Sequence, residues 1–308
     1  MRSDRNKKKK KRKSLKIFGF ILLILFIGGG AYAASVYQSL LGAVNTMKGT
    51  EHKTDKRVED ITFKKQDPFS LLILGVDERK NDSGRSDTMI VMTVNPKKES
   101  IQMLSLPRDT RTEIIGRGTT EKMNHAYAYG GITMAINTVE SYLDIPIDYY
   151  VKMNMQGFQD IVNSVGGITV NNDMALVYKK YSFAKGNIDL NGKEALIYSR
   201  IRKEDPRGDY GRQMRQRQVI QAVIKKGASL STLTNYDDIL DAIGKNVETN
   251  LTFNEMLSIQ KNYKSSLNKI DQFTLAGDDQ RIDGLWYNIV SDETKLEAQN
   301  RIKAHLGI

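Results

Sequence analysis

The stretch Ser70-Leu-Leu-Ile-Leu-Gly-Val76 decides the fold, because a continuous apolar run of this length is typical of a strand buried on both faces. Residues 88–94 and 100–106 are predicted as two further strands. They are joined by the turn Asn95-Pro-Lys-Lys-Glu-Ser100. Three consecutive strands predict a β-sheet at the start of the folded region.

Helices and strands alternate after these three strands. A helix is predicted over residues 133–142, after Gly130-Gly131, and another over residues 155–165, with Asn154 as its cap. Further elements are expected as strands at 147–153, 168–170 and 286–290 and helices at 192–199, 212–226, 236–243, 254–263 and 294–306. This order predicts an α/β fold, a mixed central sheet with helices on both faces.

The amino terminus combines a basic tail with a long uncharged segment. Residues 1–16 hold seven lysines and three arginines against one aspartate, and residues 17–47 hold no charged side chain. An apolar run of roughly 20 residues spans a bilayer, and the preceding lysines place the tail in the cytoplasm. We expect a single-pass type II protein of the cell membrane. Its parts would be a cytoplasmic tail (1–16), a transmembrane helix (17–38), an extracytoplasmic stalk (39–66) and an extracytoplasmic domain (67–308).

A cleaved signal peptide is the alternative for the uncharged segment, because Ala31-Tyr-Ala33 has the small-x-small pattern of a cleavage site. The length of the apolar run favours a retained membrane anchor.

The overall composition narrows the class of function. The tail supplies +9 of the formal net charge of +11, so the remaining chain is nearly neutral. A nucleic-acid binder of low specificity spreads its cations along a broad stripe, so we expect no nucleic-acid partner. There is no cysteine and there are only three histidines. Disulfides, thiolate metal sites and a cysteine nucleophile are therefore excluded.

The densest cluster of positive charge lies in Tyr198-Ser-Arg-Ile-Arg-Lys-Glu-Asp-Pro-Arg-Gly-Asp-Tyr-Gly-Arg-Gln-Met-Arg-Gln-Arg217, which contains seven cations. Arg212, Arg215 and Gln216 have the i, i+3, i+4 spacing of one helix face. Buried arginine is costly without an anion, and a helix amino terminus attracts anions. The segment therefore predicts half of a phosphate or pyrophosphate site. The apolar residues that continue the stripe are Val219, Ile220 and Val223.

A structural network is the alternative for this cluster, in which the arginines pair with the protein's own carboxylates. Within the segment, the available acids are Glu204, Asp205 and Asp209.

Carboxylates stand where the predicted strands end or begin. Asp77 ends the first strand and Asp87 opens the second, with Arg85 between them. Ligands of open α/β sheets bind at strand ends, and paired carboxylates there suit Mg²⁺. Turn or cap roles are the alternative for each aspartate. The third strand delivers Arg108 and Asp109 to the same rim.

Five short motifs follow one another along the chain. They are Gly75-Val-Asp77, Arg85-Ser-Asp-Thr88, Leu106-Pro-Arg-Asp109, Lys122-Met-Asn-His-Ala-Tyr-Ala128 and the run from Tyr198 to Gln216. Together they resemble the LytR-CpsA-Psr family of cell-envelope proteins, and within it the teichoic acid transferases of Gram-positive bacteria. The resemblance extends from about residue 70 to about residue 226.

The resemblance implies a phosphotransferase. Such an enzyme moves an anionic glycopolymer, such as wall teichoic acid, from an undecaprenyl-pyrophosphate carrier to a hydroxyl of peptidoglycan. It implies that Asp77 and Asp87 hold Mg²⁺ or Mn²⁺, and that they act in catalysis with Arg85, Arg108 and Arg202. The side chains implied to grip the pyrophosphate are Arg108, Lys122, Arg200, Arg202, Arg212, Arg215 and Gln216.

Several points stay open at this level. The base that deprotonates the acceptor hydroxyl is Asp77, Asp109 or Asp209. The prenyl chain needs a dry groove, which the apolar strands and the stripe on the arginine helix would line. A polyprenyl-pyrophosphate hydrolase or lipid-binding protein, and a transcriptional attenuator, are the alternative functions.

Overall fold

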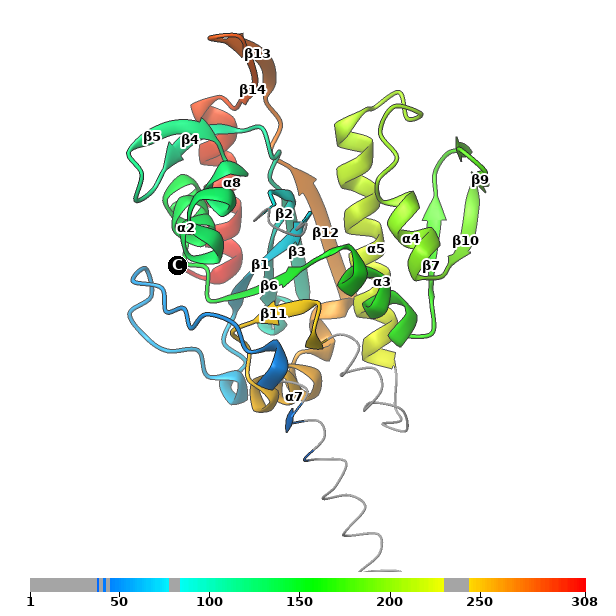
Figure 1. Cartoon of the computed structure of the whole chain (residues 1–308). Coiled ribbons are helices and arrows are strands. Elements are labelled where there is room, and N and C mark those ends of the chain that lie inside the picture. Colours follow the sequence, from blue (N-terminus) through cyan, green and yellow to red (C-terminus); the bar gives the residue numbers. More distant parts are fainter. Residues whose placement is uncertain (1–37, 39–40, 43–44, 78–83, 230–243) are drawn as a thin grey trace, which may run out of the picture.

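The structure is a computed structural model in which a mixed sheet is covered by helices on both faces (Figure 1). This confirms the predicted fold class. The described residues are 38, 41–42, 45–77, 84–229 and 244–308. The expected helix at 236–243 and nearly all of the expected transmembrane segment lie outside them. Within the described part of the chain, no helix is both long and apolar enough to cross a membrane.

The central sheet has six strands. In spatial order they are β11 (Val247–Thr249), β6 (Tyr149–Met153), β1 (Phe69–Val76), β2 (Ser86–Asn95), β3 (Ser100–Ser105) and β12 (Lys269–Thr274). β6, β1, β3 and β12 run in one direction, and β2 and β11 run in the other. The carboxyl ends of four strands therefore meet at one edge, together with the amino end of β2. In an open α/β sheet this is the edge where ligands bind.

The first three predicted strands are confirmed as β1, β2 and β3, and the expected strand at 147–153 is confirmed as β6. The sequence did not predict the two edge strands, β11 and β12. The six residues of β12 are half-buried or exposed, so this strand lacks the continuous apolar run that marks the centre of the sheet.

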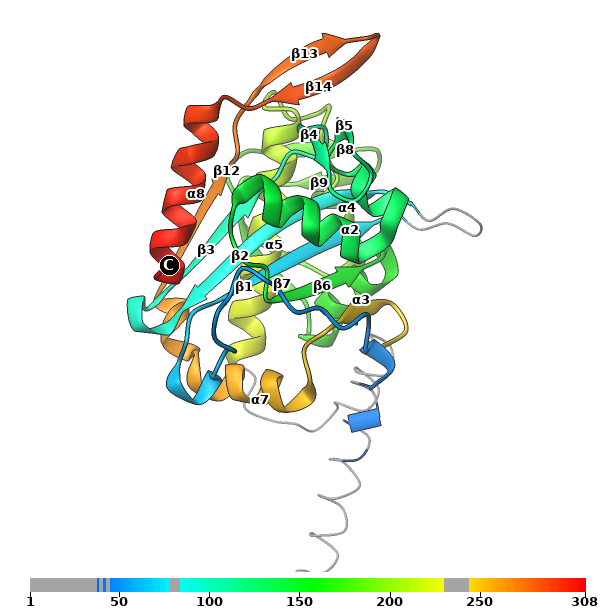
Figure 2. The same ribbon diagram turned by 90° about the vertical axis from the view of Figure 1, so that its left-hand side faces the viewer.

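Side chains of β1 alternate between two hydrophobic cores. Leu72 and Leu74 face the layer of α2 (His125–Leu143) and α8 (Asp292–Leu306), whereas Leu71 and Ile73 face the opposite layer. That second layer consists of η1 (Phe63–Lys65), α5 (Asp209–Ser229), α7 (Phe253–Asn262) and η3 (Lys264–Asn268). Figure 2 shows α2 and α8 on one side of the sheet and α5 behind it. Both faces of β1 are thus removed from water, as its unbroken apolar sequence requires.

A third core lies beside the sheet, next to α5. It is built from α3 (Met155–Ser164), α4 (Gly192–Tyr198) and a group of short strands. These strands are β7 (Ile168–Asn172), β8 (Leu176–Tyr178), β9 (Tyr181–Phe183) and β10 (Gly186–Leu190). The remaining elements are η2 (Pro96–Lys98) and the hairpins of β4 (Arg111–Ile114) with β5 (Thr119–Lys122) and β13 (Asp278–Ile282) with β14 (Leu285–Ile289).

Local signals in the sequence located the described helices with small shifts at their ends, except at the start of α2. The side chain of Asn154 accepts a hydrogen bond from the backbone N–H of Gly157 at 2.8 Å, which confirms the predicted cap of α3. α2 begins at His125 rather than at residue 133. The backbone is nevertheless non-helical at Gly130 and Gly131, where a positive φ at Gly131 interrupts the helix.

The described part of the expected stalk lies against the domain. Met47 and Phe63 are buried, and Phe63 belongs to the second core. The Arg57 guanidinium binds both carboxylate oxygens of Asp148, one of them at 3.0 Å. Residues 45–66 are therefore fastened to the base of the sheet.

The carboxy-terminal helix is fixed by a buried histidine. His305 is only 3% exposed, and its Nδ1 and Nε2 lie 2.7 Å and 2.9 Å from the hydroxyls of Thr93 and Ser100. Burial lowers the pKa of His305 to about 4, with a further contribution from the charge of Lys98.

This histidine is expected to make the protein less stable in mild acid. Below the ordinary pKa of 6.5 the unfolded chain binds a proton that the folded protein excludes until the pH reaches about 4. The free energy of unfolding should therefore fall by about 2 to 3 kcal/mol between pH 7.5 and pH 4.5. Urea unfolding of the native chain and of His305→Gln across this range measures the difference in slope. Equal slopes in the two proteins would contradict the assignment.

Candidate active site

A cavity of about 280 Å³ opens at the carboxyl edge of the sheet, between the strand ends and helices α3, α4 and α5. Arginine and aspartate side chains lie among apolar ones in its wall. The lining residues are Ile73, Gly75, Val76, Asp77, Asp87, Thr88, Arg108, Met153, Asn154, Met155, Phe158, Leu196, Ser199, Arg200, Arg202, Arg212, Gln216 and Ile220.

The cavity brings together most of the residues predicted from the sequence. The predicted residues in its wall are Asp77, Asp87, Arg108, Arg200, Arg202, Arg212 and Gln216. The predicted residues outside the wall are Arg85, Lys122 and Arg215. Four arginines thus face two aspartates, and the wall carries an excess of positive charge.

Strand ends position the two aspartates. Asp77 directly follows β1, and its backbone N–H donates to the carbonyl of Arg85 at 3.2 Å, so these two residues close the loop between β1 and β2. Asp87 is the second residue of β2. Because β1 and β2 are antiparallel neighbours, the two carboxylates reach the same cavity from adjacent strands.

Arg108 is held between carboxylates. It follows β3 and donates from Nη1 to the Oδ1 of Asp87 at 2.8 Å, with Asp109 3.5 Å from its Nε. Burial by itself would lower the pKa of Arg108, but the charges of Asp87, Asp109 and Asp209 outweigh it and raise the pKa. The guanidinium is therefore oriented before any ligand arrives.

Arg212 is the most buried arginine in the wall of the cavity. Its side chain is 11% exposed, and its Nη2 contacts the Asp209 carboxylate at 2.7 Å, while Arg202 lies 3.7 Å from the same carboxylate. Burial lowers the pKa of Arg212, and the neighbouring cations Arg108 and Arg202 lower it further. Its Nε is buried without a hydrogen-bond partner among the described residues. An anion in the cavity would relieve both penalties.

Lys122 and Arg85 lie near the cavity without lining it. The Lys122 ammonium contacts the Asp109 carboxylate at 2.7 Å, next to Arg108 in the chain. Arg85 is exposed and stands opposite Asp77 across the β1–β2 loop. Lys122 therefore supports the loop that carries Arg108, and Arg85 lies at the outer rim.

Arg215 departs from the prediction of an anion ligand. It is fully buried, its guanidinium pairs with Asp205, and its Nε donates to the carbonyl of Tyr198 at 3.1 Å. Asp205, 2% exposed, also accepts two hydrogen bonds of 2.9 Å from the Arg207 side chain. The structural network considered as an alternative therefore exists for Arg207 and Arg215. It holds the loop that presents Arg200 and Arg202.

Part of the cavity wall is apolar. Ile73, Met153, Phe158, Leu196 and Ile220 form this part, and Ile73 and Ile220 also belong to the second core. Ile220 follows Gln216 by one helical turn on α5.

The other two residues of the predicted apolar stripe point elsewhere. Val219 is fully buried in the third core, and Val223 packs against it. The stripe on α5 is thus divided between two rows, with Arg212, Gln216 and Ile220 toward the cavity and Arg215 and Val219 toward α4 and β7.

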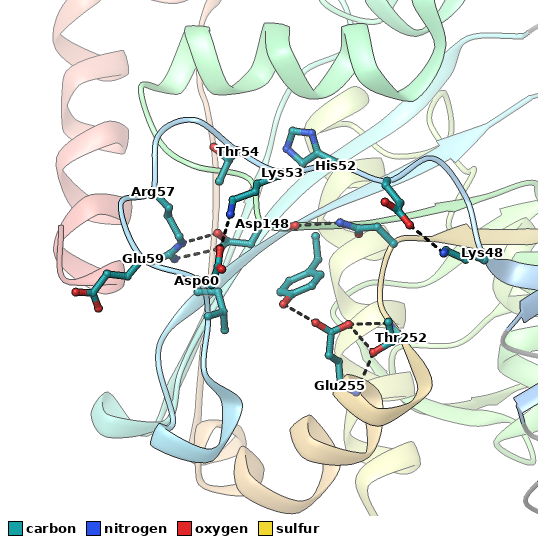
Figure 3. Close-up of a pocket in the computed structure, with 14 residues that line it drawn as sticks. Lys48, His52, Lys53, Thr54, Arg57, Glu59, Asp60, Asp148, Thr252 and Glu255 are labelled. Atoms are coloured by element: carbon teal, nitrogen blue, oxygen red, sulfur yellow. Dashed lines mark hydrogen bonds and ion pairs between the residues drawn. The ribbon is translucent and has the colours of Figure 1, made fainter.

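A second, larger cavity of about 360 Å³ lies at the base of the molecule, between residues 48–61 and α7 (Figure 3). Most of its charged groups already have partners. Arg57 pairs with Asp148, Lys53 contacts Asp60 at 2.8 Å, and the Tyr149 hydroxyl donates to Glu255 at 3.0 Å. These contacts attach the chain to the sheet, so the arginine-lined cavity is the stronger candidate for chemistry.

The sequence-family model of the LytR_cpsA_psr family matches residues 35–304. The chain belongs to the LytR-CpsA-Psr family. A relative in Bacillus cereus, the polyisoprenyl-teichoic acid–peptidoglycan teichoic acid transferase TagU, is 51% identical over 94% of this chain and 96% of its own. The crystal structure of Bacillus subtilis TagU has a TM-score of 0.65 at 49% identity, over 78% of this chain and 97% of that one. TagT bound to LIIa-WTA has a TM-score of 0.72 at 32% identity, over 85% and 99%.

Proposed function

We propose that this protein is a phosphotransferase that moves an anionic glycopolymer, such as teichoic acid, from an undecaprenyl-pyrophosphate carrier to a hydroxyl of peptidoglycan. The observation that carries the proposal is the presence of four arginines and several apolar side chains in the wall of a single cavity. A pyrophosphate joined to a prenyl chain likewise combines a charged and an apolar part. The name of the Bacillus cereus relative, a teichoic acid transferase, supports this assignment.

The arginines bind and orient the pyrophosphate. Arg108 and Arg212, fixed by Asp87 and Asp209, present guanidinium groups to the cavity from the segment after β3 and from α5, and Arg202 adds a more exposed one. Guanidinium forks bind phosphate oxygens in pairs and stabilise the charge that grows on the leaving oxygen during phosphoryl transfer. The apolar side chains of the wall take the first prenyl units and exclude water from them.

The chemical step exchanges one phosphorus–oxygen bond for another. The acceptor hydroxyl oxygen attacks the phosphorus that bears the glycopolymer, the bond from that phosphorus to the bridging oxygen breaks, and undecaprenyl phosphate leaves. A carboxylate takes the hydroxyl proton. Among Asp77, Asp109 and Asp209, Asp77 lines the cavity, whereas Asp109 and Asp209 lie outside its wall. We therefore assign the proton to Asp77, at the carboxylate oxygen that a bound metal ion would leave free.

A divalent ion fits this site as part of the proposal. In the described residues no group of three or more acidic, histidine or cysteine side chains is placed to hold a metal. Mg²⁺ is nevertheless commonly held by one or two carboxylates together with water and substrate phosphates. Asp77 and Asp87 would supply the carboxylates, and bound Mg²⁺, or Mn²⁺, would neutralise charge on the pyrophosphate.

The proposal includes the placement of the protein. The basic tail, residues 1–16, would lie in the cytoplasm, residues 17–38 would cross the membrane, and the catalytic domain would lie outside the cell. The tether raises the local concentration of the lipid donor at the cavity.

Transfer by the purified full-length chain tests the function. An undecaprenyl-pyrophosphate-linked teichoic precursor, peptidoglycan and Mg²⁺ are supplied, and polymer attached to peptidoglycan and released undecaprenyl phosphate are measured together. We expect turnover by the native chain, and losses of at least about 100-fold in Asp77→Asn and Arg202→Ala. Lys193→Ala, an exposed change on α4, serves as the control. Free polymer as the product would identify a hydrolase instead, and no turnover would leave only lipid binding.

A further inference from the structure

The hairpin of β13 and β14 extends beyond the body of the domain (Figures 1 and 2). Its strands pair from Asp278 with Ile289 to Ile282 with Leu285, and Asp283-Gly284 turns the chain with positive φ at both residues. This is the tight two-residue turn that matches the twist of two strands. The hairpin is therefore an ordered arm, although it shares no pairing with the central sheet.

The arm exposes the single tryptophan of the chain. Trp286 is 59% exposed, on a two-stranded ribbon that has no core of its own to bury it. Its direct cross-strand neighbour on the same face is Arg281, and Asp279 lies two residues further along that face. Leu285, also exposed, points to the opposite face because neighbouring strand residues alternate. One face thus carries an aromatic ring directly opposite a hydrogen-bond donor, with an acceptor two residues further along the facing strand.

The base of the arm is attached to the loops that hold the arginines of the cavity. The backbone N–H of Asn288 donates to the carbonyl of Asp109, the residue after Arg108, at 2.8 Å. The hydroxyl of Tyr210, in the first turn of α5, donates to the carbonyl of Gly277 at 3.0 Å. The arm is therefore held in a defined position relative to the candidate active site and forms an extension of its rim.

We propose that this face of the arm binds the acceptor glycan strand of peptidoglycan, with the Trp286 ring stacked on a sugar ring. The inference rests on the proposed function. Aromatic rings carry negative charge on their faces and attract the positively polarised C–H groups of a sugar ring, while polar neighbours bind hydroxyl and acetamido groups.

Charge and position favour the glycan over the other substrates of the reaction. The hairpin contains three aspartates and one arginine, so it repels an anionic polymer and anionic lipid headgroups. It also lies at the end of the molecule opposite residues 45–48, the part nearest the expected anchor (Figures 1 and 2). The uncharged glycan backbone is not repelled, and in the proposed topology it lies on the side toward which the arm points.

Sedimentation with purified peptidoglycan sacculi free of teichoic acid tests this inference. The full-length chain in detergent is compared with Trp286→Ala, with the conservative change Trp286→Tyr, and with Leu285→Ala on the opposite face as the matched control. We expect Trp286→Ala to weaken binding about tenfold, as expected for the loss of one stacked aromatic ring, and the other two variants to bind nearly as the native chain does. Equal binding by Trp286→Ala, or no binding by the native chain, would overturn the proposal.

Kinetics separate this inference from the proposed function. In the transfer assay Trp286→Ala should raise the KM for peptidoglycan about tenfold and leave kcat and the KM for the lipid donor unchanged, because the arm lies outside the cavity. A loss of kcat instead would overturn the docking role. Loss of binding to anionic phospholipid vesicles, with binding to sacculi intact, would also overturn it in favour of a membrane contact. If the native chain binds sacculi through Trp286 but transfers nothing, the proposed function fails and the docking surface stands.

Discussion

Arg212→Leu is expected to lower the rate of polymer transfer by about 10²- to 10³-fold, the usual cost of removing one preorganised group that stabilises charge in a transition state. The same change should leave the protein as stable as the native chain or more so. Arg212 is 11% exposed, its burial lowers its pKa, and its Nε has no hydrogen-bond partner among the described residues. A leucine at this position avoids the desolvation of a cation that is only partly compensated by Asp209.

The transfer rate and the thermal stability, measured together, distinguish an arginine that serves catalysis from one that only supports the fold. Initial rates of undecaprenyl phosphate release and thermal unfolding are measured for Arg212→Leu and Arg212→Lys. The lysine variant keeps the charge but loses the planar fork, so an intermediate rate is expected. Arg301→Leu, an exposed change on α8 away from the cavity, is the control. A large fall in melting temperature with a rate close to native would show that Arg212 only supports the fold.

The central strands of the sheet could be predicted from the sequence because the pattern that marks a buried strand lies within the strand's own residues. A strand buried on both faces needs an unbroken apolar run, and β1 shows one in its own residues. The edge strand β12 is half-buried or exposed, and it forms because it pairs with β3, which is distant in sequence. Of the hairpin, β14 was predicted as the strand at 286–290, whereas β13 is largely exposed and carries no apolar pattern of its own.

The residues of the candidate site also divide into those whose position the sequence predicted and those whose position it did not. Asp77, Asp87 and Arg108 were predictable because strand ends in an α/β sheet converge on one edge. The arginine segment allowed two interpretations, and the structure contains both. Arg212 lines the cavity, whereas Arg215, three residues later, turns toward Asp205. A spacing of i, i+3 places two side chains on one broad face, but which of them meets a carboxylate depends on how the preceding loop returns to the helix.

Asp205→Ala is expected to lower the free energy of unfolding by about 3 to 5 kcal/mol, because it leaves the buried guanidinium of Arg215 without its counterion. Arg215 is fully buried and Asp205 is 2% exposed, so water does not replace the lost contact. Burial alone would raise the pKa of Asp205, but hydrogen bonds from Arg207 and Arg215 outweigh it and hold the pKa well below its ordinary value. The stabilisation is therefore complete above the unfolded pKa of about 3.9 and is lost as the pH falls through the lower folded value.

The same change should also impair transfer, because the loop fastened by Asp205 presents Arg200 and Arg202 to the cavity. Urea unfolding at pH 7 measures the stability, and the transfer assay is run at a temperature where the variant stays folded. Asp205→Asn keeps the size of the side chain and removes its charge, so it isolates the electrostatic part of the loss.

The double variant Asp205→Ala with Arg215→Met tests whether the loss of stability in Asp205→Ala comes from the unpaired charge of Arg215. A buried ion pair is strongly destabilised when one partner is removed, but removal of both partners in favour of an apolar side chain costs much less. The double variant should therefore recover most of the stability lost in Asp205→Ala. Arg207 loses its buried partner in the single and in the double variant alike, so this part of the loss is not recovered. Recovery of stability without recovery of transfer would show that the network serves the position of Arg200 and Arg202. Additive losses in the double variant would contradict the pairing and assign the effect to the packing of the loop alone.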